Sequence, residues 1–442
     1  MFILIILRFG TTGRDSQQSP EAYCPFNRIM ENYSIVIFIM AIMIGLSAMA
    51  DSVRIPYPVL LITAGIAIGF IPALPVIELN PEVVFLIFLP PLLYDAAFNI
   101  NFQDFRTNLS TISTLAISLV FITASGIAAV AYYLIPGMTW PLAFVLGSIL
   151  SATDAVAAMS ITKGLGLSSK TNTILEGESL VNDASALVAY RFSVAAVTGS
   201  AFIFWQASAE FAVLLLGGAI VGLVIGRILG AIIMRIHHNV QATIGMMLLM
   251  PFVAYRVAEE LEVSGVIAVV ILGLGIADFS KKIFPDRLKQ QSKSIWEIII
   301  FLLNGLIFIL IGLQFPYVIK NISADQLLPY IGYALIITII ALLLRMVRVF
   351  WQRANLQKGF ERGHSRISES ALLDVKNSLI ISWSGMRGIV SLAIAIGLPT
   401  HLHDGTPFPM RDAIIFISVA VVLFTLIGQG LTLPWIVKRL RD

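Results

Sequence analysis

The chain has 442 residues, of which 58% are hydrophobic and only 12% are charged, and its formal net charge is +3. Soluble proteins contain about 25% charged residues, so this composition excludes an ordinary soluble enzyme or nucleic-acid-binding protein and indicates a membrane protein with several spans. The single cysteine, Cys24, excludes an intramolecular disulfide framework and a cysteine-based metal site.

The N-terminal residues 1–29 differ from the rest of the chain. A short apolar run, Phe2–Leu7, is followed by a polar stretch, and six apolar residues are too few to cross a bilayer. Met30 comes just before the first long apolar segment, so translation is expected to start there. Residues 1–29 are therefore predicted to be a dispensable extension, and 30–442 the membrane domain.

From residue 33 onward, thirteen apolar segments are long enough to cross a bilayer. They fall near 33–50, 56–72, 82–100, 111–135, 139–161, 172–197, 208–236, 241–258, 263–279, 295–318, 326–350, 376–399 and 411–437. The sequence thus predicts an all-α polytopic membrane protein with about thirteen transmembrane helices.

Basic residues are distributed unevenly over the links between these segments. The odd-numbered links and the C-terminal end hold 17 Lys and Arg residues, whereas the even-numbered links hold three, namely Arg256, Lys320 and Arg411. Loops rich in Lys and Arg stay in the cytoplasm. We therefore expect a multi-pass protein of the inner (plasma) membrane, with its N-terminus outside and its C-terminus in the cytoplasm.

The fifth and twelfth segments carry a charge among small polar residues, Asp154 in one and Arg387 in the other. Close helix packing explains small residues such as Ser151 and Gly388 equally well, but it does not require a charge. An interrupted helix gives a reason for a charge, because opposite charges compensate the dipoles of its two half-helix ends. The free carbonyls at these ends can also bind a cation. The two interruptions lie seven segments apart, as in an inverted repeat of segments 4–6 and 11–13.

The sixth segment contains acidic residues near its middle. At helical spacing Glu178 and Asn182 share one face, and Ser179 and Asp183 share the next. A charge in hydrocarbon costs at least ~2.5 kcal/mol, so such residues face a partner or a water-filled path. Ser179 and Asp183 offer hard oxygen atoms, which suit a small hard cation better than a transition metal. The alternative is that Asp183 only completes a buried polar network.

Two more charges lie inside predicted spans, Asp95 after the Pro90–Pro91 pair and Arg345 in the eleventh segment. Snorkelling to the membrane surface explains Arg348, three residues further on. For Arg345 we favour a buried ion pair with Glu178, which has no other evident counter-charge.

The string Gly177–Asp183 (GESLVND) resembles the GESLxND signature of sodium/proton antiporters of the NhaP and eukaryotic NHE type. Further matches in the same order are Phe88–Leu93, Ala152–Asp154, Arg345 and Gly385–Gly388. The resemblance implies a six-helix core, here mainly 111–197 and 326–437, that moves against a dimerisation scaffold in a homodimer. Ala155 departs from the pattern, because many relatives have proline there, so a milder interruption of the fifth segment is expected.

The resemblance also implies roles for individual residues. Asp183 would carry either the proton or the alkali cation, and the site would be completed by Ser179, Asp154 and the backbone of Thr153, with Asp95 nearby. Glu178 and Asn182 would be structural, Glu178 through Arg345. Arg387 is expected to compensate the broken helices.

The expected mechanism is competition at one carboxylate. Desolvation disfavours the charged form of Asp183 and a bound cation favours it, so a proton and a sodium ion exclude each other there. The residue before Asp183 is an amide, Asn182, whereas electrogenic relatives resemble an Asp-Asp pair at this position. The exchange is therefore expected to be electroneutral. Sodium (or lithium or potassium) and protons would be cargo, with no bound cofactor and no enzymatic reaction, and oxygen ligands do not decide among the alkali cations.

Two other function classes, intramembrane proteases and cation channels, fit the sequence less well than transport by exchange. Tyr94-Asp95 resembles half of an intramembrane aspartyl protease site, but the sequence lacks the Gly-x-Gly-Asp of the other half. A rhomboid-type protease would need a glycine where Ser382 stands, and a histidine within a span. A cation channel is the remaining alternative, which flux without counter-transport would distinguish.

Overall fold

The computed structural model describes the chain from residue 37 onward. The described residues are 37–49, 57–71, 81–100, 102–162, 165–199, 204–320, 322–362, 369–402 and 404–441. The predicted extension 1–29, with Cys24, lies outside them. Within them the chain is helical apart from its links and one isolated β-bridge between His401 and Pro407, so the predicted all-α fold is confirmed.

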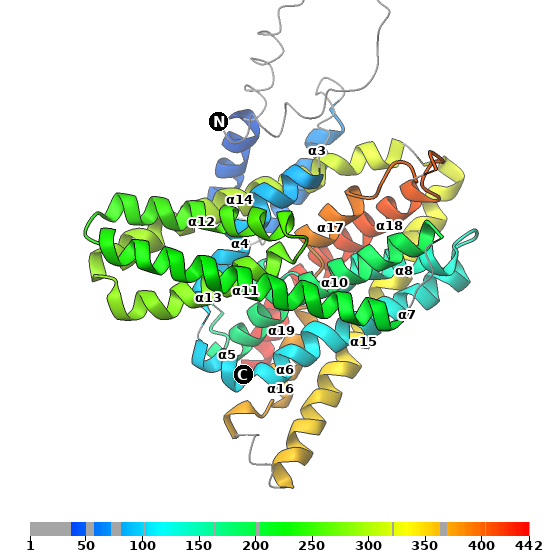
Figure 1. The fold of residues 1–442 in the computed structure, drawn as a ribbon. Coiled ribbons are helices and arrows are strands. Elements are labelled where there is room, and N and C mark those ends of the chain that lie inside the picture. Colours follow the sequence, from blue (N-terminus) through cyan, green and yellow to red (C-terminus); the bar gives the residue numbers. More distant parts are fainter. Residues whose placement is uncertain are drawn as a thin grey trace, which may run out of the picture.

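The helices follow one another along the whole described chain (Figure 1). The first half contains a helix at Ile37–Met49, then α3 (Tyr57–Gly69), α4 (Pro81–Asn99), α5 (Phe102–Thr107), α6 (Leu109–Ser113), the π-helical turn η1 (Thr114–Ser118), α7 (Leu119–Leu134), α8 (Trp140–Ser151), α9 (Ala155–Thr162) and α10 (Ser169–Val197). The second half contains α11 (Phe204–Ile236), α12 (Val240–Glu260), α13 (Gly265–Ile283), α14 (Asp286–Lys320), α15 (Ala324–Glu361), the 3₁₀ turn η2 (Glu369–Ala371), α16 (Val375–Trp383), α17 (Ile389–Ile396), α18 (Arg411–Phe424), the π-helical turn η3 (Thr425–Gln429) and α19 (Gly430–Arg441).

Among the described residues, eight helical stretches are long and apolar enough, by length and composition, to cross a membrane. Shorter apolar helices lie at Ile37–Met49, Tyr57–Gly69 and Leu86–Asn99. Each of the thirteen predicted ranges contains helix. The polytopic membrane fold is thus confirmed, whereas the number of crossings and the inverted repeat stay predictions.

Both predicted interruptions are present. Residues 152–154 separate α8 from α9, and residues 384–388 separate α16 from α17. At the first break Ala152 is extended (φ −66°, ψ 141°), which ends the helical hydrogen-bond ladder. Ala155 is the first residue of α9, so this break forms without the proline that many relatives have. Each break leaves free carbonyls on one side and free N–H groups on the other.

The two breaks lie against each other. The N–H of Asp154 donates to the carbonyl of Met386 at 2.8 Å, which joins the two interruptions through their backbones. The N–H of Arg387 donates to Oγ1 of Thr425, the first residue of η3, at 3.1 Å. A Cβ at Gly388 would collide with the side chain of Asp154, so the second break passes this close only with glycine at that position.

The helices pack in two groups that α10 connects. The first group, α4 and α11–α13, shares an apolar core that includes Tyr94 and Leu272 and lies to the left in Figure 1. The second, α7, α8, α15, α17 and α18, shares a larger core that includes Leu146 and Ile417 and lies to the right.

The helices α3 and α14 pack on each other and add Leu61 and Phe308 to this larger core. The five helices of the second group fall within the ranges predicted for the moving core, whereas α3 and α14 lie outside them. The separate movement of the second group stays a prediction.

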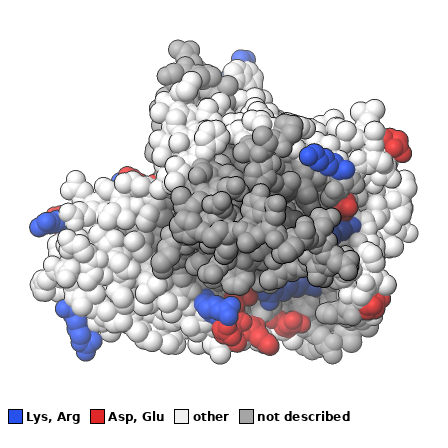
Figure 2. Space-filling view, turned by 90° about the horizontal axis from the view of Figure 1, so that it is seen from above, with Lys and Arg blue, Asp and Glu red and all other residues white. Residues whose placement is uncertain are grey.

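The surface of the molecule is apolar over wide areas. Apart from the grey atoms, Figure 2 shows mostly uncharged residues, with the charged side chains in a few small groups. On α11, Val213, Leu216 and Ile220 are each more than 60% exposed (61%, 66% and 61%). Such a surface is expected where lipid rather than water covers the helices.

Candidate ion-binding site

A cavity of about 620 Å³ lies between α4, α9, α10 and the second break. Its wall includes all five residues predicted to bind the ion or the proton, namely Asp95, Thr153, Asp154, Ser179 and Asp183. It also includes Gly166 and Leu167 of the α9–α10 link, so the cavity extends from the breaks toward that link. The structure therefore brings together residues from four separate parts of the chain.

Ser179 and Asp183 come from the middle of α10, one turn apart. The helix starts at Ser168, whose Oγ caps it by accepting from the N–H of Thr171 at 3.1 Å. Both Ser179 and Asp183 line the cavity, as their spacing predicted. Asp183 is buried, with 6% of its surface exposed, so its carboxylate has little contact with bulk water.

Asp154 and Ser179 meet at the start of the half-helix α9. Oδ1 of Asp154 accepts from the N–H of Val156 at 2.8 Å, and Oγ of Ser179 accepts from the N–H of Ala155 at 3.3 Å. A carboxylate at a helix N-terminus compensates the positive end of the helix dipole. Asp154 therefore carries a charge that the first break itself stabilises.

Arg387 compensates the opposite ends of the broken helices. Its Nε donates to the carbonyl of Leu150 at 3.0 Å, and its Nη1 donates to the carbonyl of Gly385 at 2.6 Å. Leu150 lies in the last turn of α8 and Gly385 just after α16, where helix carbonyls have no intrahelical partner. These contacts are the ones that the predicted compensation of the broken helices requires, and the role itself stays a prediction.

The predicted ion pair between Glu178 and Arg345 is confirmed. The contact is bidentate, with Nη1 on Oε1 and Nη2 on Oε2, the latter at 2.8 Å. Nε of Arg345 donates to the carbonyl of Ile381 at 3.0 Å, and both partners are buried. Arg345 also runs so close to Gly385 that a Cβ there would collide with it. The negative charge of Glu178 is thus neutralised inside the protein.

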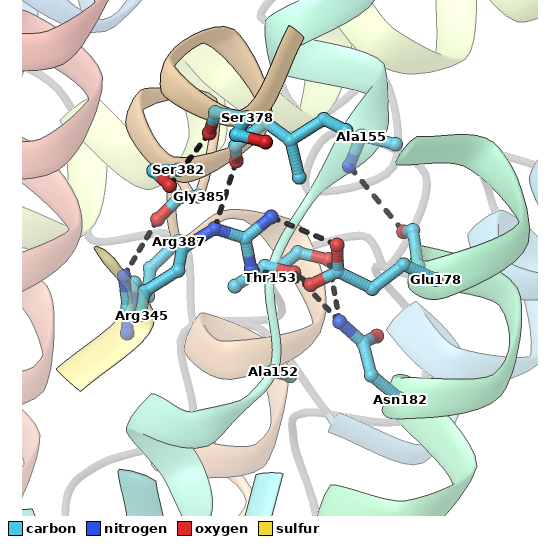
Figure 3. Close-up of polar contacts among 12 residues, drawn as sticks. Ala152, Thr153, Ala155, Glu178, Asn182, Arg345, Ser378, Ser382, Gly385 and Arg387 are labelled. Atoms are coloured by element: carbon cyan, nitrogen blue, oxygen red, sulfur yellow. Dashed lines mark hydrogen bonds and ion pairs between the residues drawn. The ribbon is translucent and has the colours of Figure 1, made fainter. Parts of the chain in front are cut away.

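Asn182 belongs to the same network (Figure 3). Its Nδ2 donates to Oγ1 of Thr153 at 2.7 Å, and that hydroxyl donates to Oε1 of Glu178 at 3.1 Å. Nδ2 of Asn182 also lies 3.3 Å from the carbonyl oxygen of Thr153, so both oxygens of this residue help to hold the first break to α10. Glu178 and Asn182 face this network, while Ser179 and Asp183 face the cavity.

The structure adds one acidic residue to the site residues that the sequence predicts. Glu176 lines the cavity together with Asp95 and Asp183. It lies seven residues before Asp183, which is two helical turns on one face of α10. The spacing of seven residues in the sequence indicates that Glu176 shares a face of α10 with Asp183. Glu178 and Asn182 lie between them on another face.

The donors that face the cavity are carboxylate, hydroxyl and carbonyl oxygens. Among the described residues there is no group of three or more His, Cys, Asp or Glu side chains suited to a metal ion. A mixed oxygen set of this kind suits a weakly held alkali cation rather than a transition metal. The same carboxylate, Asp183, can hold a proton instead.

Comparison with known proteins agrees with this geometry. The family described as "Sodium/hydrogen exchanger, transmembrane" matches residues 36–439. The chain is 34% identical over 412 residues to the "Uncharacterized Na(+)/H(+) exchanger Rv2287" of Mycobacterium tuberculosis, covering 92% of this chain and 74% of that one. It is 36% identical over 397 residues to the "Sodium, potassium, lithium and rubidium/H(+) antiporter" of Bacillus subtilis, covering 86% of this chain and 57% of the relative.

A solved structure shows the same fold. The sodium proton antiporter MjNhaP1 of Methanocaldococcus jannaschii superposes with a TM-score of 0.70 at 19% sequence identity, over 93% of this chain and 99% of that one. The match of the family over nearly the whole chain, joined to the paired breaks and the cavity between them, shows that this chain belongs to the sodium/hydrogen exchanger family.

Proposed function

We propose that this chain exchanges sodium ions, or another alkali cation, for protons across the membrane, with Asp183 as the residue that carries either ion. The observation that carries the proposal is the contrast between two acids on α10. Glu178 is neutralised by Arg345, whereas Asp183 faces the cavity beside Ser179 and the start of α9. The names of the relatives support sodium and proton as cargo.

Exchange follows from competition at the Asp183 carboxylate. A sodium ion needs the charged carboxylate, and a proton on the same oxygen removes that charge, so binding of one releases the other. The hydroxyl of Ser179 and the backbone of Thr153 would contribute further oxygens to the cation. In this proposal the sodium ion and the proton are cargo, and no cofactor or enzymatic step takes part.

Transport further requires that Asp183 face each side of the membrane in turn. We propose that the core, mainly 111–197 and 326–437, moves against the remaining helices in a homodimer once Asp183 is neutralised by either ion. The asymmetry of basic residues supports a C-terminus in the cytoplasm and an N-terminus outside the plasma membrane. With this orientation the α9–α10 link, and the end of the cavity at that link, face the cytoplasm.

The proposal is tested with purified protein in liposomes, by following the internal pH after sodium is added outside. Asp183→Asn should abolish exchange with no loss of folded protein, because an amide mimics the protonated side chain but cannot release a proton. Asp278→Asn is a matched control, since Asp278 is exposed on α13 and paired with Lys282. The control should exchange normally. Normal turnover in Asp183→Asn would contradict the proposed role of this residue.

A further inference from the structure

Glu176 lines the cavity but has no task in the mechanism above. Of the other acids nearby, Glu178 is neutralised by Arg345, whereas Asp95 accepts from a neutral amide, Nδ2 of Asn99, which donates to its Oδ1 at 2.8 Å. Within the described residues no hydrogen bond or ion pair engages the carboxylate of Glu176. A half-buried acid with no such partner in the described part of a membrane protein is expected to serve the transported ion.

The position of Glu176 places it on the route to Asp183. Asn172, Glu176 and Asp183 follow one another at spacings of four and seven along one face of α10, and all three line the same cavity. With a rise of 1.5 Å per residue, Glu176 lies about 10 Å closer than Asp183 to the start of α10. The α9–α10 link borders the cavity at that end, through Gly166 and Leu167. An ion that moves between the link and Asp183 therefore passes Glu176.

Asp95 is the second acid of this region and comes from another helix. It lies on α4, lines the same cavity, and is close enough to Glu176 for the two carboxylates to repel each other. One positive charge between the two carboxylates relieves this repulsion. Sodium ions and protons both meet this need. A merely structural acid would instead be expected to have a fixed basic partner.

We propose that Glu176 and Asp95, the outer carboxylate pair, hold one exchangeable positive charge between the α9–α10 link and Asp183. This inference rests on the proposed function and adds an entry step to it. A proton that leaves the carboxyl group of Asp183 passes through water to a carboxylate oxygen of Glu176, and from there to water on the side of the link. A cation that enters from that side first replaces the proton at the outer carboxylate pair and then moves on to Asp183.

The inference is tested by measuring sodium-dependent exchange separately from each side of oriented proteoliposomes. In Glu176→Gln the apparent KM for sodium on the side of the link should rise about fivefold, which corresponds to losing roughly 1 kcal/mol of attraction. The apparent KM on the opposite side should not change, because ions entering there do not pass Glu176. Glu176→Asp keeps the charge and should keep a KM close to that of the unmodified protein.

Glu260→Gln is the matched control, since Glu260 is exposed at the far end of α12 and paired with Arg256. It should leave both KM values unchanged. An unchanged KM on the side of the link in Glu176→Gln, or an equal rise on both sides, would overturn the inference. If Glu176→Gln does not fold, Asp95→Asn removes the other carboxylate of the pair and should raise the same KM on the side of the link only, and an unchanged KM there would overturn the inference.

The two proposals fail separately. If Asp183→Asn still exchanges ions, the proposed function is wrong, whatever Glu176 does. If Asp183→Asn is inactive while Glu176→Gln keeps its KM on the side of the link, only the outer carboxylate pair is wrong.

Discussion

Two acids five positions apart on α10 show how the surroundings of a carboxylate decide its task. Glu178 accepts from both terminal nitrogens of Arg345 and from the hydroxyl of Thr153, so its charge is balanced within the protein. Asp183 faces the cavity beside Ser179. A buried pair of this kind contributes little net stability, but removing one partner leaves the other charge uncompensated.

Glu178→Gln should therefore lower stability more than it changes ion affinity. An unpaired Arg345 in this buried position is expected to cost ~3–5 kcal/mol. The double variant Glu178→Gln with Arg345→Gln should recover part of that loss, because neither charge is then left alone. Thermal melting of the four proteins measures the coupling. If the two single effects simply add, the pair does not act as a unit.

Single residues were predictable from the sequence wherever a charge interrupted an apolar segment. Arg345 and Glu178 were expected to pair because Glu178 has no other evident counter-charge, and the structure joins them. Glu176 was not assigned, because a sequence does not show which face of a helix borders a cavity. That boundary depends on how α4 and α9 pack against α10, which is a tertiary property.

At the scale of elements, the site depends on two broken helices. The dipoles at their free ends are compensated by one charged side chain from each break. Asp154 caps the start of α9, and Arg387 donates to carbonyls at the ends of both α8 and α16. The N–H of Asp154 binds the carbonyl of Met386 in the other break. The two breaks therefore form one unit, and a disturbance in one should reach the other.

Gly388→Ala tests this dependence. The added methyl group would collide with the side chain of Asp154, which would have to leave the N–H groups of α9. We expect exchange to fall strongly and stability to drop by ~1–3 kcal/mol, the usual cost of overpacking. Proton flux and melting temperature measure the two effects.

Gly428→Ala is the control for this substitution. A Cβ at Gly428, in the π-helical turn η3, would meet nothing within 4 Å. This variant should exchange normally and keep its melting temperature or raise it, because alanine restricts the unfolded chain more than glycine does. Equal behaviour of the two alanine variants would show that the close approach at Gly388 is unimportant.

The interruptions themselves were predictable, since packing does not require a full charge inside an apolar segment. The bond from Asp154 to Met386 was not, because it joins residues more than 200 positions apart. The π-helical turns η1 and η3 were not predicted either. Their residues, Thr114–Ser118 and Thr425–Gln429, have no local pattern that separates them from ordinary helix.

At the scale of the whole molecule, the two groups of helices are joined near the end of α10 that lies away from the link. Nη2 of Arg191 on α10 lies 3.4 Å from Oε2 of Glu259 on α12. The same glutamate accepts through Oε1 from the N–H of Gly265 at 3.3 Å, at the start of α13. A half-exposed pair contributes only about 0.2–1 kcal/mol. It is therefore weak enough to open in every transport cycle.

If the core moves against the other helices, a permanent link at this position should stop transport. In a Cys24→Ser background, Arg191→Cys and Glu259→Cys can be joined by a short bifunctional thiol reagent. Exchange in the cross-linked protein is expected to stop. The two single-cysteine variants, treated with the same reagent, are the controls and should remain active. Undiminished exchange after complete cross-linking would show that α10 and α12 do not separate during transport.

The charge moved in each cycle is also a property of the whole molecule. Asn182 stands before Asp183 and donates to Thr153, so it does not titrate, and Asp154 is held as the cap of α9. The outer carboxylate pair loads and releases its charge on one side and adds no transported charge. Asp183 alone then crosses, with one proton or one sodium ion, and exchange should be electroneutral.

One net charge moved across 100 mV would change the driving force by ~2.3 kcal/mol. Proteoliposomes whose potential is set by potassium and valinomycin should therefore reach the same steady-state sodium gradient at every voltage, and a gradient that follows the voltage would show that a second charge crosses with Asp183.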